Sequence, residues 1–255
     1  MAHLGHDLRG NGPEGVIVLH EFLGDHRNYD PVLPYLDGAA FTYALADFRG
    51  YGRSKDLAGA YTLAEVVADV RDLAASLGWT RYHVVGHSMS GMVAQRLALD
   101  AGEAVKSMVL IAPVPASGFK ADAAQKTALL SLLDADETAF AGIAARTGNR
   151  YDPAWIAFKV AMARSASTPE ARRGYLEMFT GNDFADAARG LKTPLLVVLG
   201  AHDAPFYRPD SLTPIYRDLY PHAEIAVCGD AGHYPMLETP PLLISLVQGF
   251  LRRQA

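Results

Sequence analysis

A serine with the surroundings of a nucleophile stands at position 88, in the run Gly-His-Ser-Met-Ser-Gly of residues 86–91. The run follows an apolar, strand-like stretch (83–85) and precedes a helix-like stretch (92–99), so it predicts a sharp strand-to-helix turn with Ser88 at its tip. Ser90 stands where the usual pattern has glycine, and it is small enough for close helix–strand contact. The alternative is an ordinary turn in which Ser88 only caps the helix.

A serine hydroxyl needs a base, and the base needs an acid that orients it. Among the nine histidines, His233 lies in a Gly-Asp-Ala-Gly-His run directly after a predicted strand (224–227). Sites in open α/β sheets form on such loops, at the carboxyl ends of strands. Asp203 follows another predicted strand (195–199) and is the expected acid, while Asp230, three residues before His233, is the alternative.

An acyl-transfer intermediate carries a negative oxygen, which backbone N–H groups must stabilise. One expected donor is the residue after the nucleophile, Met89, and the other is Phe22, on the loop that follows the predicted strand 16–19. Glu21 precedes Phe22, and an ionised carboxylate there would oppose the developing charge. Glu21 either points away and pairs with a cation or recognises the substrate. We expect the first, with no part in the chemical step.

Strand-like and helix-like stretches alternate along most of the chain, which is typical of a parallel sheet covered by helices on both faces. The predicted strands are residues 16–19, 41–46, 83–85, 105–111, 195–199 and 224–227, with an edge strand within 3–9. Between 111 and 195 the chain is Ala-rich and helical in period, with helix starts expected at 152–153, 168–169 and 182–183. The expected domains are an α/β core (1–116 and 191–255) and an inserted helical lid (117–190).

Apolar side chains of the lid should line a pocket against the core, because pockets favour such junctions, although most of them pack helix against helix. The candidates for the substrate pocket are Glu21, Trp155, Phe158, Met162, Tyr175, Met178, Phe179, Phe206 and Tyr234. Such a wall favours a small or medium apolar acyl or lactone substrate.

These motifs together resemble the α/β-hydrolase superfamily, in its lidded esterase, lactonase and cofactor-free haloperoxidase branch. The blocks that carry the resemblance are residues 20–24, 47–54, 86–91, 200–203 and 232–233, and the order Ser88, Asp203, His233 is that of the family. The resemblance implies an α/β-hydrolase fold and a serine hydrolase that cleaves a carboxylic ester or lactone through an acyl-enzyme, with no metal or organic cofactor. It also implies a structural role for the 47–54 loop.

The chain departs from the family pattern at Glu21, where relatives have glycine. Relatives that hydrolyse carbon–halogen bonds or epoxides carry aspartate at the nucleophile position, and Ser88 sets them aside. Two alternatives stay open: a carbon–carbon bond hydrolase with the same triad, and a slow-turnover ligand sensor that signals through its lid.

The amino-acid composition limits the kinds of partner that we expect the protein to bind. The formal net charge is −5 and there is no Lys/Arg run, which argues against nucleic-acid binding. There is no signal-peptide pattern and no apolar stretch near the roughly 20 residues that span a bilayer. The single cysteine, Cys228, fits a reducing compartment. We therefore expect a cytoplasmic protein acting on a small molecule, with no membrane partner.

Overall fold

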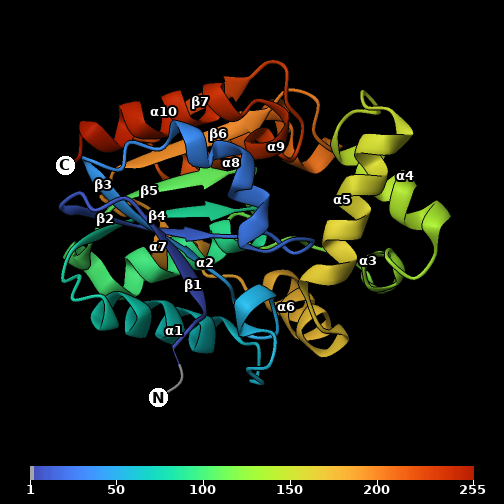
Figure 1. Ribbon diagram of the computed structural model, residues 1–255, viewed down its shortest axis with the longest axis horizontal. Helices are drawn as coiled ribbons and strands as arrows, with labels where there is room; N and C mark the ends of the chain where they lie inside the picture. The colour runs from blue at the N-terminus through green and yellow to red at the C-terminus, as the bar shows by residue number, and fades with distance from the viewer. Residues whose placement is uncertain (1–2) are drawn as a thin grey trace.

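The computed structural model describes residues 3–255 and contains a seven-stranded sheet in the order β1-β3-β2-β4-β5-β6-β7 (Figure 1). The strands are β1 (His6–Arg9), β2 (Glu14–Leu19), β3 (Phe41–Ala46), β4 (Tyr82–His87), β5 (Val105–Ile111), β6 (Leu195–Gly200) and β7 (Glu224–Cys228). Only β1 runs antiparallel, along β3, and the other pairs are parallel. The predicted mostly parallel sheet is confirmed, and the predicted edge strand is shorter than expected, beginning at His6.

Helices cover both faces of the sheet, as Figure 1 shows. Helices α1 (Leu63–Ser76) and α2 (Met89–Ala101) lie on one face, while α10 (Pro240–Arg252) and the 3₁₀ helix η1 (His26–Tyr35) lie on the other. Strands β4 and β6 are buried along their whole length, as a parallel sheet between two helical layers requires. The remaining elements outside the long insertion are η2 (Gly52–Ser54), η3 (Gly102–Ala104), η4 (Pro205–Tyr207), α8 (Pro209–Leu219) and α9 (Pro235–Glu238).

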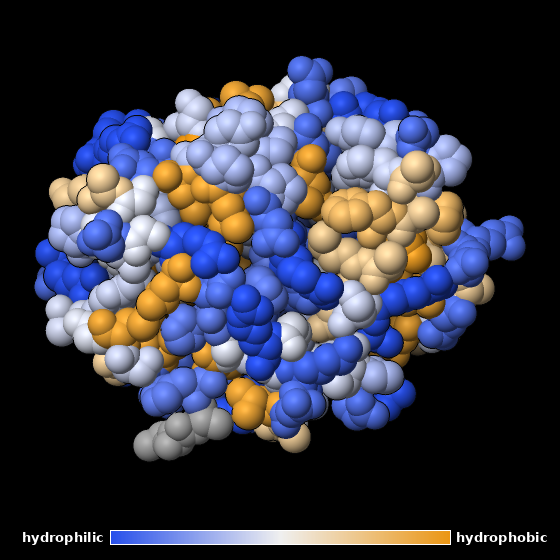
Figure 2. All heavy atoms as spheres, in the orientation of Figure 1, coloured by the Kyte–Doolittle hydropathy of each residue, from blue (hydrophilic) through white to orange (hydrophobic). Residues whose placement is uncertain are grey.

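The segment between β5 and β6 contains five helices and no strand of the sheet, and most of it lies at the carboxyl ends of the strands (Figure 1). We call residues 117–190 the cap. Its helices are α3 (Ala123–Ser131), α4 (Asp136–Arg146), α5 (Pro153–Ala166), α6 (Pro169–Gly181) and α7 (Ala185–Ala188). Figure 2 shows apolar surface over the cap, at the right, and separate apolar areas over the rest of the molecule.

The cap helices begin largely where their capping residues predict. The side chains of Asp152 and Thr168 accept hydrogen bonds from the first turns of α5 and α6. The third expected start, at 182–183, is wrong by two residues, because α7 begins after Phe184 and has no side-chain cap. Within residues 3–255, no helix combines the length and the apolar composition that crossing a bilayer requires.

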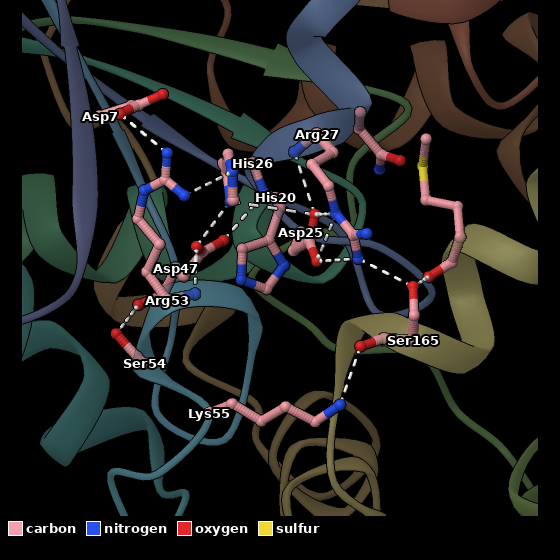
Figure 3. A network of polar contacts seen from close by, with 12 residues as sticks. Asp7, His20, Asp25, His26, Arg27, Asp47, Arg53, Ser54, Lys55 and Ser165 are labelled. Atoms are coloured by element: carbon pink, nitrogen blue, oxygen red, sulfur yellow. Dashed lines mark hydrogen bonds and ion pairs between the residues drawn. The ribbon is translucent and has the colours of Figure 1, made fainter.

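The loop of residues 47–54 is held by a buried carboxylate (Figure 3). Asp47 accepts hydrogen bonds from the backbone N–H of His26 (2.8 Å) and of Arg53 (2.8 Å), and its Oδ2 lies 2.7 Å from His26 Nδ1. The neighbouring Arg49 makes a two-point ion pair with Asp69 at 2.6 and 2.8 Å. Every charged group of the loop named here is engaged in fixing the loop itself.

The same network reaches the cap through Ser165 of α5 (Figure 3). The Arg27 guanidinium, which is paired with Asp25, donates to Ser165 Oγ at 2.9 Å. Lys55 Nζ donates to the Ser165 carbonyl at 2.9 Å. These contacts are partly exposed, so each contributes little to stability.

The contact between His26 and Asp47 predicts a pH-dependent stability. Burial alone would lower the pKa of His26, but the hydrogen bond and charge of Asp47 outweigh burial and raise it. The stability from this pair is therefore fully present below the unfolded histidine pKa of about 6.5 and is lost as the pH rises through the folded value.

We expect His26→Gln to lower the free energy of unfolding more at pH 5.5 than at pH 8.5, as measured by urea denaturation. His222→Gln is the control, because His222 is exposed and its ring contacts only a backbone carbonyl. An equal loss at both pH values would contradict the assignment.

Candidate active site

Ser88 occupies the tip of a strained turn between β4 and α2. Its backbone has φ +53° and ψ −114°, a left-handed conformation that costs energy for any residue with a side chain. The Ser88 N–H donates to the Ile111 carbonyl (2.9 Å), and the Ser88 carbonyl accepts from the Val114 N–H (2.9 Å). The end of β5 therefore holds the turn in place.

Ser90 contributes more than its small size. Its hydroxyl accepts from the His87 N–H at 2.8 Å and lies 3.0 Å from the Leu19 carbonyl, at the end of β2. The hydroxyl thus ties the nucleophile turn to the strand that leads into the Glu21–Phe22 loop. A glycine at this position would lack both contacts.

The side chains of His233 and Asp203, predicted to be the base and its orienting acid, lie in contact. His233 Nδ1 lies 2.8 Å from Asp203 Oδ2, and both side chains are buried. An ionised carboxylate only accepts, so Nδ1 carries the proton and Nε2 is left as the basic atom. The backbone carbonyl of the alternative acid, Asp230, accepts a hydrogen bond from the Arg150 guanidinium at 3.0 Å.

The loop that carries His233 is fixed through its backbone. The His233 N–H donates to the Arg146 carbonyl at the end of cap helix α4 (2.7 Å), and the His233 carbonyl lies 2.7 Å from His87 Nε2. Glu238 accepts from the N–H groups of Gly232 (2.8 Å) and Tyr234 (2.9 Å). Burial lowers the pKa of His87 to about 3, so at neutral pH His87 acts as an uncharged donor.

The peptide group between Glu21 and Phe22 is held by the ring of His20. His20 Nε2 accepts from the Phe48 N–H (3.0 Å), so Nδ1 carries the proton that it donates to the Glu21 carbonyl (2.8 Å). In a trans peptide the N–H points opposite to the C=O, so His20 fixes the direction of the Phe22 N–H. Tyr51 adds a hydrogen bond to the Phe22 carbonyl at 3.0 Å.

The two expected oxyanion donors, the N–H groups of Phe22 and Met89, remain a prediction that the structure allows. Phe22 and Ser88 line one cavity, and Met89 is the first residue of α2. Within residues 3–255 neither the Phe22 N–H nor the Met89 N–H donates to another protein group. Both are therefore free to bind a substrate oxygen.

Glu21 is paired with a cation, as expected, but it is not turned out of the site. Its Oε1 lies 2.9 Å from Nζ of Lys159, which comes from cap helix α5, and its other oxygen accepts from the Leu23 N–H. Lys159 Nζ also donates to the Leu23 carbonyl (2.7 Å) and lies 4.7 Å from the ring centre of Tyr234. Both charged side chains are fully enclosed.

The two charges stabilise one another. Burial alone would raise the pKa of Glu21, but the charge of Lys159, followed by smaller contributions from His87 and His233, lowers it to about 2. Burial lowers the pKa of Lys159, although the negative charge of Glu21 acts in the opposite direction. Sequence reasoning had no means of finding this partner, because Lys159 is 138 positions away in the chain.

A cavity of about 40 Å³ lies over Ser88. Its walls are formed by Glu21, Phe22, Leu23, Ser88, Phe119, Leu129, Arg146, Phe179, Tyr207 and His233. The volume holds a few water molecules. The site is thus closed to all but very small molecules in this conformation.

Most of the aromatic and apolar residues expected in the pocket lie elsewhere. Glu21 and Phe179 line the cavity, whereas Trp155, Phe158, Met162, Tyr175, Met178, Phe206 and Tyr234 do not. Helical periodicity shows that a residue faces something apolar but does not show which neighbour it faces.

Three of these side chains have identifiable packing partners outside the cavity. Trp155 stacks on Tyr151 of the cap with ring centres 4.4 Å apart. Tyr175 packs among core aromatic rings, 5.6 Å from Phe48. Tyr234 lies under the Lys159 ammonium.

The others either face outward or support the wall from behind. Phe158 and Met162 border an outer groove between α5 and η1, and half of the Phe158 surface is exposed. Phe206 packs against Phe119 with ring centres 4.7 Å apart, and Met178 is buried.

Tyr207 is a site residue that the sequence reasoning missed. Its ring centre is 4.6 Å from that of His233, and Tyr207 lines the same cavity as Ser88. Burial raises the pKa of Tyr207 to about 12, so the phenol stays protonated. A signal was present, since Tyr207 follows Asp203 on the same loop at the carboxyl end of β6.

One group of side chains has the spacing of metal ligands. Asp25, His26 and Asp47 each offer a ligand atom within 4.8 Å of the others. Those atoms are already engaged by one another, by Arg27 and by backbone N–H groups, and this explains why they gather (Figure 3). These three side chains hold the loop of residues 47–54 in the conformation described above.

The fold and the arrangement of the site together indicate the family to which the protein belongs. A model of the α/β-hydrolase fold family matches residues 15–240, and the chain belongs to that family. A pimeloyl-acyl-carrier-protein methyl ester esterase of Salmonella heidelberg is 28% identical over 219 residues, covering 80% of each chain. The structure of an enol-lactonase from Burkholderia xenovorans superposes with a TM-score of 0.85 at 20% identity, over 98% of this chain and 96% of the other.

A shorter match has higher identity. The acetyltransferase component of an acetoin-cleaving system from Cupriavidus necator is 37% identical over 110 residues. The match covers 42% of this chain and only 28% of that protein. The family and the hydrolase class are therefore established, while the named activities belong to the relatives.

Replacing the orienting acid tests the triad. Asp203→Asn should lower kcat by about 10⁴, because an amide favours the wrong tautomer of His233. Asp230→Asn is the matched control and should leave kcat within a few-fold, since the backbone carbonyl of Asp230 makes its contact. Both are measured as ester turnover by folded protein, and the reverse ranking would overturn the assignment.

Removing the charge of Glu21 should reduce stability much more than catalysis. Glu21→Gln leaves Lys159 buried without a partner and should cost about 3–5 kcal/mol in the free energy of unfolding. The double variant Glu21→Gln with Lys159→Met should recover most of that loss.

In protein that remains folded, kcat of Glu21→Gln on a neutral ester should change less than about tenfold, or about 1.4 kcal/mol in barrier. A loss of two or more orders of magnitude in kcat would show that Glu21 acts in the chemical step.

Proposed function

We propose that this chain is a serine hydrolase that cleaves a carboxylic ester or a lactone of a small to medium substrate through an acyl-enzyme. The observation that carries the proposal is the 2.8 Å contact between His233 and Asp203, beside a serine held at positive φ. Such a turn presents the hydroxyl away from the backbone, as a nucleophile requires.

In this mechanism Ser88 Oγ attacks the carbonyl carbon while His233 Nε2 takes the hydroxyl proton. Asp203 stabilises the imidazolium that forms, and the N–H groups of Phe22 and Met89 bind the oxyanion. The proton on His233 passes to the leaving alcohol. Water then attacks the acyl-enzyme by the same route and releases the acid.

Three relatives or neighbours support this reaction class by their names: a methyl ester esterase, an enol-lactonase and an esterase from Exiguobacterium antarcticum. A cavity of about 40 Å³ is too small for any of these substrate types, so turnover requires the cap to move. We place the reaction in the cytoplasm, on the basis of the single free cysteine.

Ester turnover and covalent labelling test the proposal. The protein should hydrolyse p-nitrophenyl acetate or butyrate, and Ser88→Ala should remove all but background turnover. A serine-directed phosphonate should add to Ser88, as peptide mass mapping would show.

Ser76→Ala is the control variant, because Ser76 is exposed at the end of α1, and this variant should still be labelled at Ser88. Turnover that persists undiminished in pure Ser88→Ala protein would refute the mechanism. Labelling with only trace turnover would favour the slow-turnover sensor.

A further inference from the structure

One wall of the cavity over Ser88 carries a cation that the hydrolytic mechanism does not use. Arg146, the last residue of cap helix α4, lines this cavity together with Ser88, Tyr207 and His233. Its carbonyl holds the His233 backbone at 2.7 Å, so the residue is attached directly to the catalytic loop.

Within residues 3–255, no carboxylate lies within ion-pair distance of the Arg146 guanidinium, and its one hydrogen bond runs from Nη1 to the Gly142 carbonyl (2.8 Å). A guanidinium has five N–H donors, so most of its donors remain for another acceptor. By contrast, Arg150, four residues later, is paired with Glu238 at 2.6 Å.

An arginine in the last turn of a helix also interacts favourably with the helix dipole, and the Gly142 contact is of that kind. That role does not account for its position on the cavity wall. The charge of Arg146 is the largest contribution opposing the effect of burial on the pKa of Tyr207, which lines the same cavity as Ser88. The guanidinium charge therefore acts on the space where substrate must lie.

The other charges of the site leave that positive charge without a counterpart. Glu21 is neutralised by Lys159 at 2.9 Å, and Asp203 is hydrogen-bonded to His233 outside the cavity lining. Apart from the uncharged groups around Ser88, the rest of the wall is apolar and includes Phe119, Leu129 and Phe179. An apolar wall with one unpaired guanidinium is complementary to a short hydrocarbon chain that ends in an anion.

We propose that Arg146 is a specificity-determining residue that binds a carboxylate on the acyl part of the substrate, so that the preferred substrate is a hemiester of a dicarboxylic acid or a lactone with a free carboxylate. The proposal rests on the proposed hydrolytic function. Arginine suits this role because its planar fork matches the two oxygens of a carboxylate.

Matched methyl esters test the preference. Monomethyl succinate, glutarate, adipate and pimelate are compared with the dimethyl diester of the same acid, and acid release is followed by titration at pH 7. The best hemiester should have a kcat/KM at least about tenfold above that of its diester, the scale of a hydrogen-bonded charge pair.

Arg146→Gln should remove that preference, with a loss of about 10–100-fold on the hemiester and less than about threefold on the diester. Arg146→Lys should recover part of it. Arg173→Gln is the control, since Arg173 is an exposed cap residue outside the cavity and its loss changes the net charge equally.

Binding provides a readout that does not depend on turnover. In Ser88→Ala protein, the best hemiester should bind more tightly than its diester by calorimetry, and adding Arg146→Gln should abolish the difference. Binding without any turnover by the wild-type protein would retain the carboxylate site and refute the hydrolase. Turnover with no hemiester preference, or an equal loss on both esters in Arg146→Gln, would refute the carboxylate site alone.

Discussion

One constraint, the direction of the Phe22 N–H group, accounts for many of the contacts in this part of the protein. The peptide group is fixed from behind by His20, which itself depends on the Phe48 N–H. Asp47 holds the loop that carries Phe48, through N–H groups on two separate segments. A polar chain of contacts thus runs from a buried carboxylate to the oxyanion position, and each step uses a group that would be costly to leave unpaired.

The same constraint explains why a glutamate is tolerated beside the oxyanion position. An unpaired carboxylate in a closed cavity would repel the charge that forms during acyl transfer. Lys159 cancels that charge at 2.9 Å, and its ammonium is enclosed by the Leu23 carbonyl and the Tyr234 ring. Glu21 of the loop and Lys159 of the cap therefore form one unit.

The sequence was sufficient to predict the sheet and the contact between His233 and Asp203, because both rest on local patterns. Strand runs, the turn around Ser88 and the loops after β6 and β7 each fall within a few residues of where they were expected. The cavity wall could not be predicted, since it depends on which face each cap helix turns inward. Tyr175 and Trp155 pack away from the cavity, and Arg146 and Leu129 take the wall, although nothing in helical period distinguishes them.

The closed cavity raises the question of which part of the wall gives way to substrate. Helix α5 is the costly part, because moving it would expose or unpair the buried Lys159. The end of α4 is attached to the His233 backbone, so its movement would disturb the base. Helix α3 has no buried residue and yet supplies Leu129 to the wall, and its ion pair between Lys126 and Glu177 is largely exposed. Exposed pairs contribute about 0–1 kcal/mol. On these energies α3 is the part of the wall whose displacement would cost least, whereas displacing α4 or α5 would disturb His233 or Lys159.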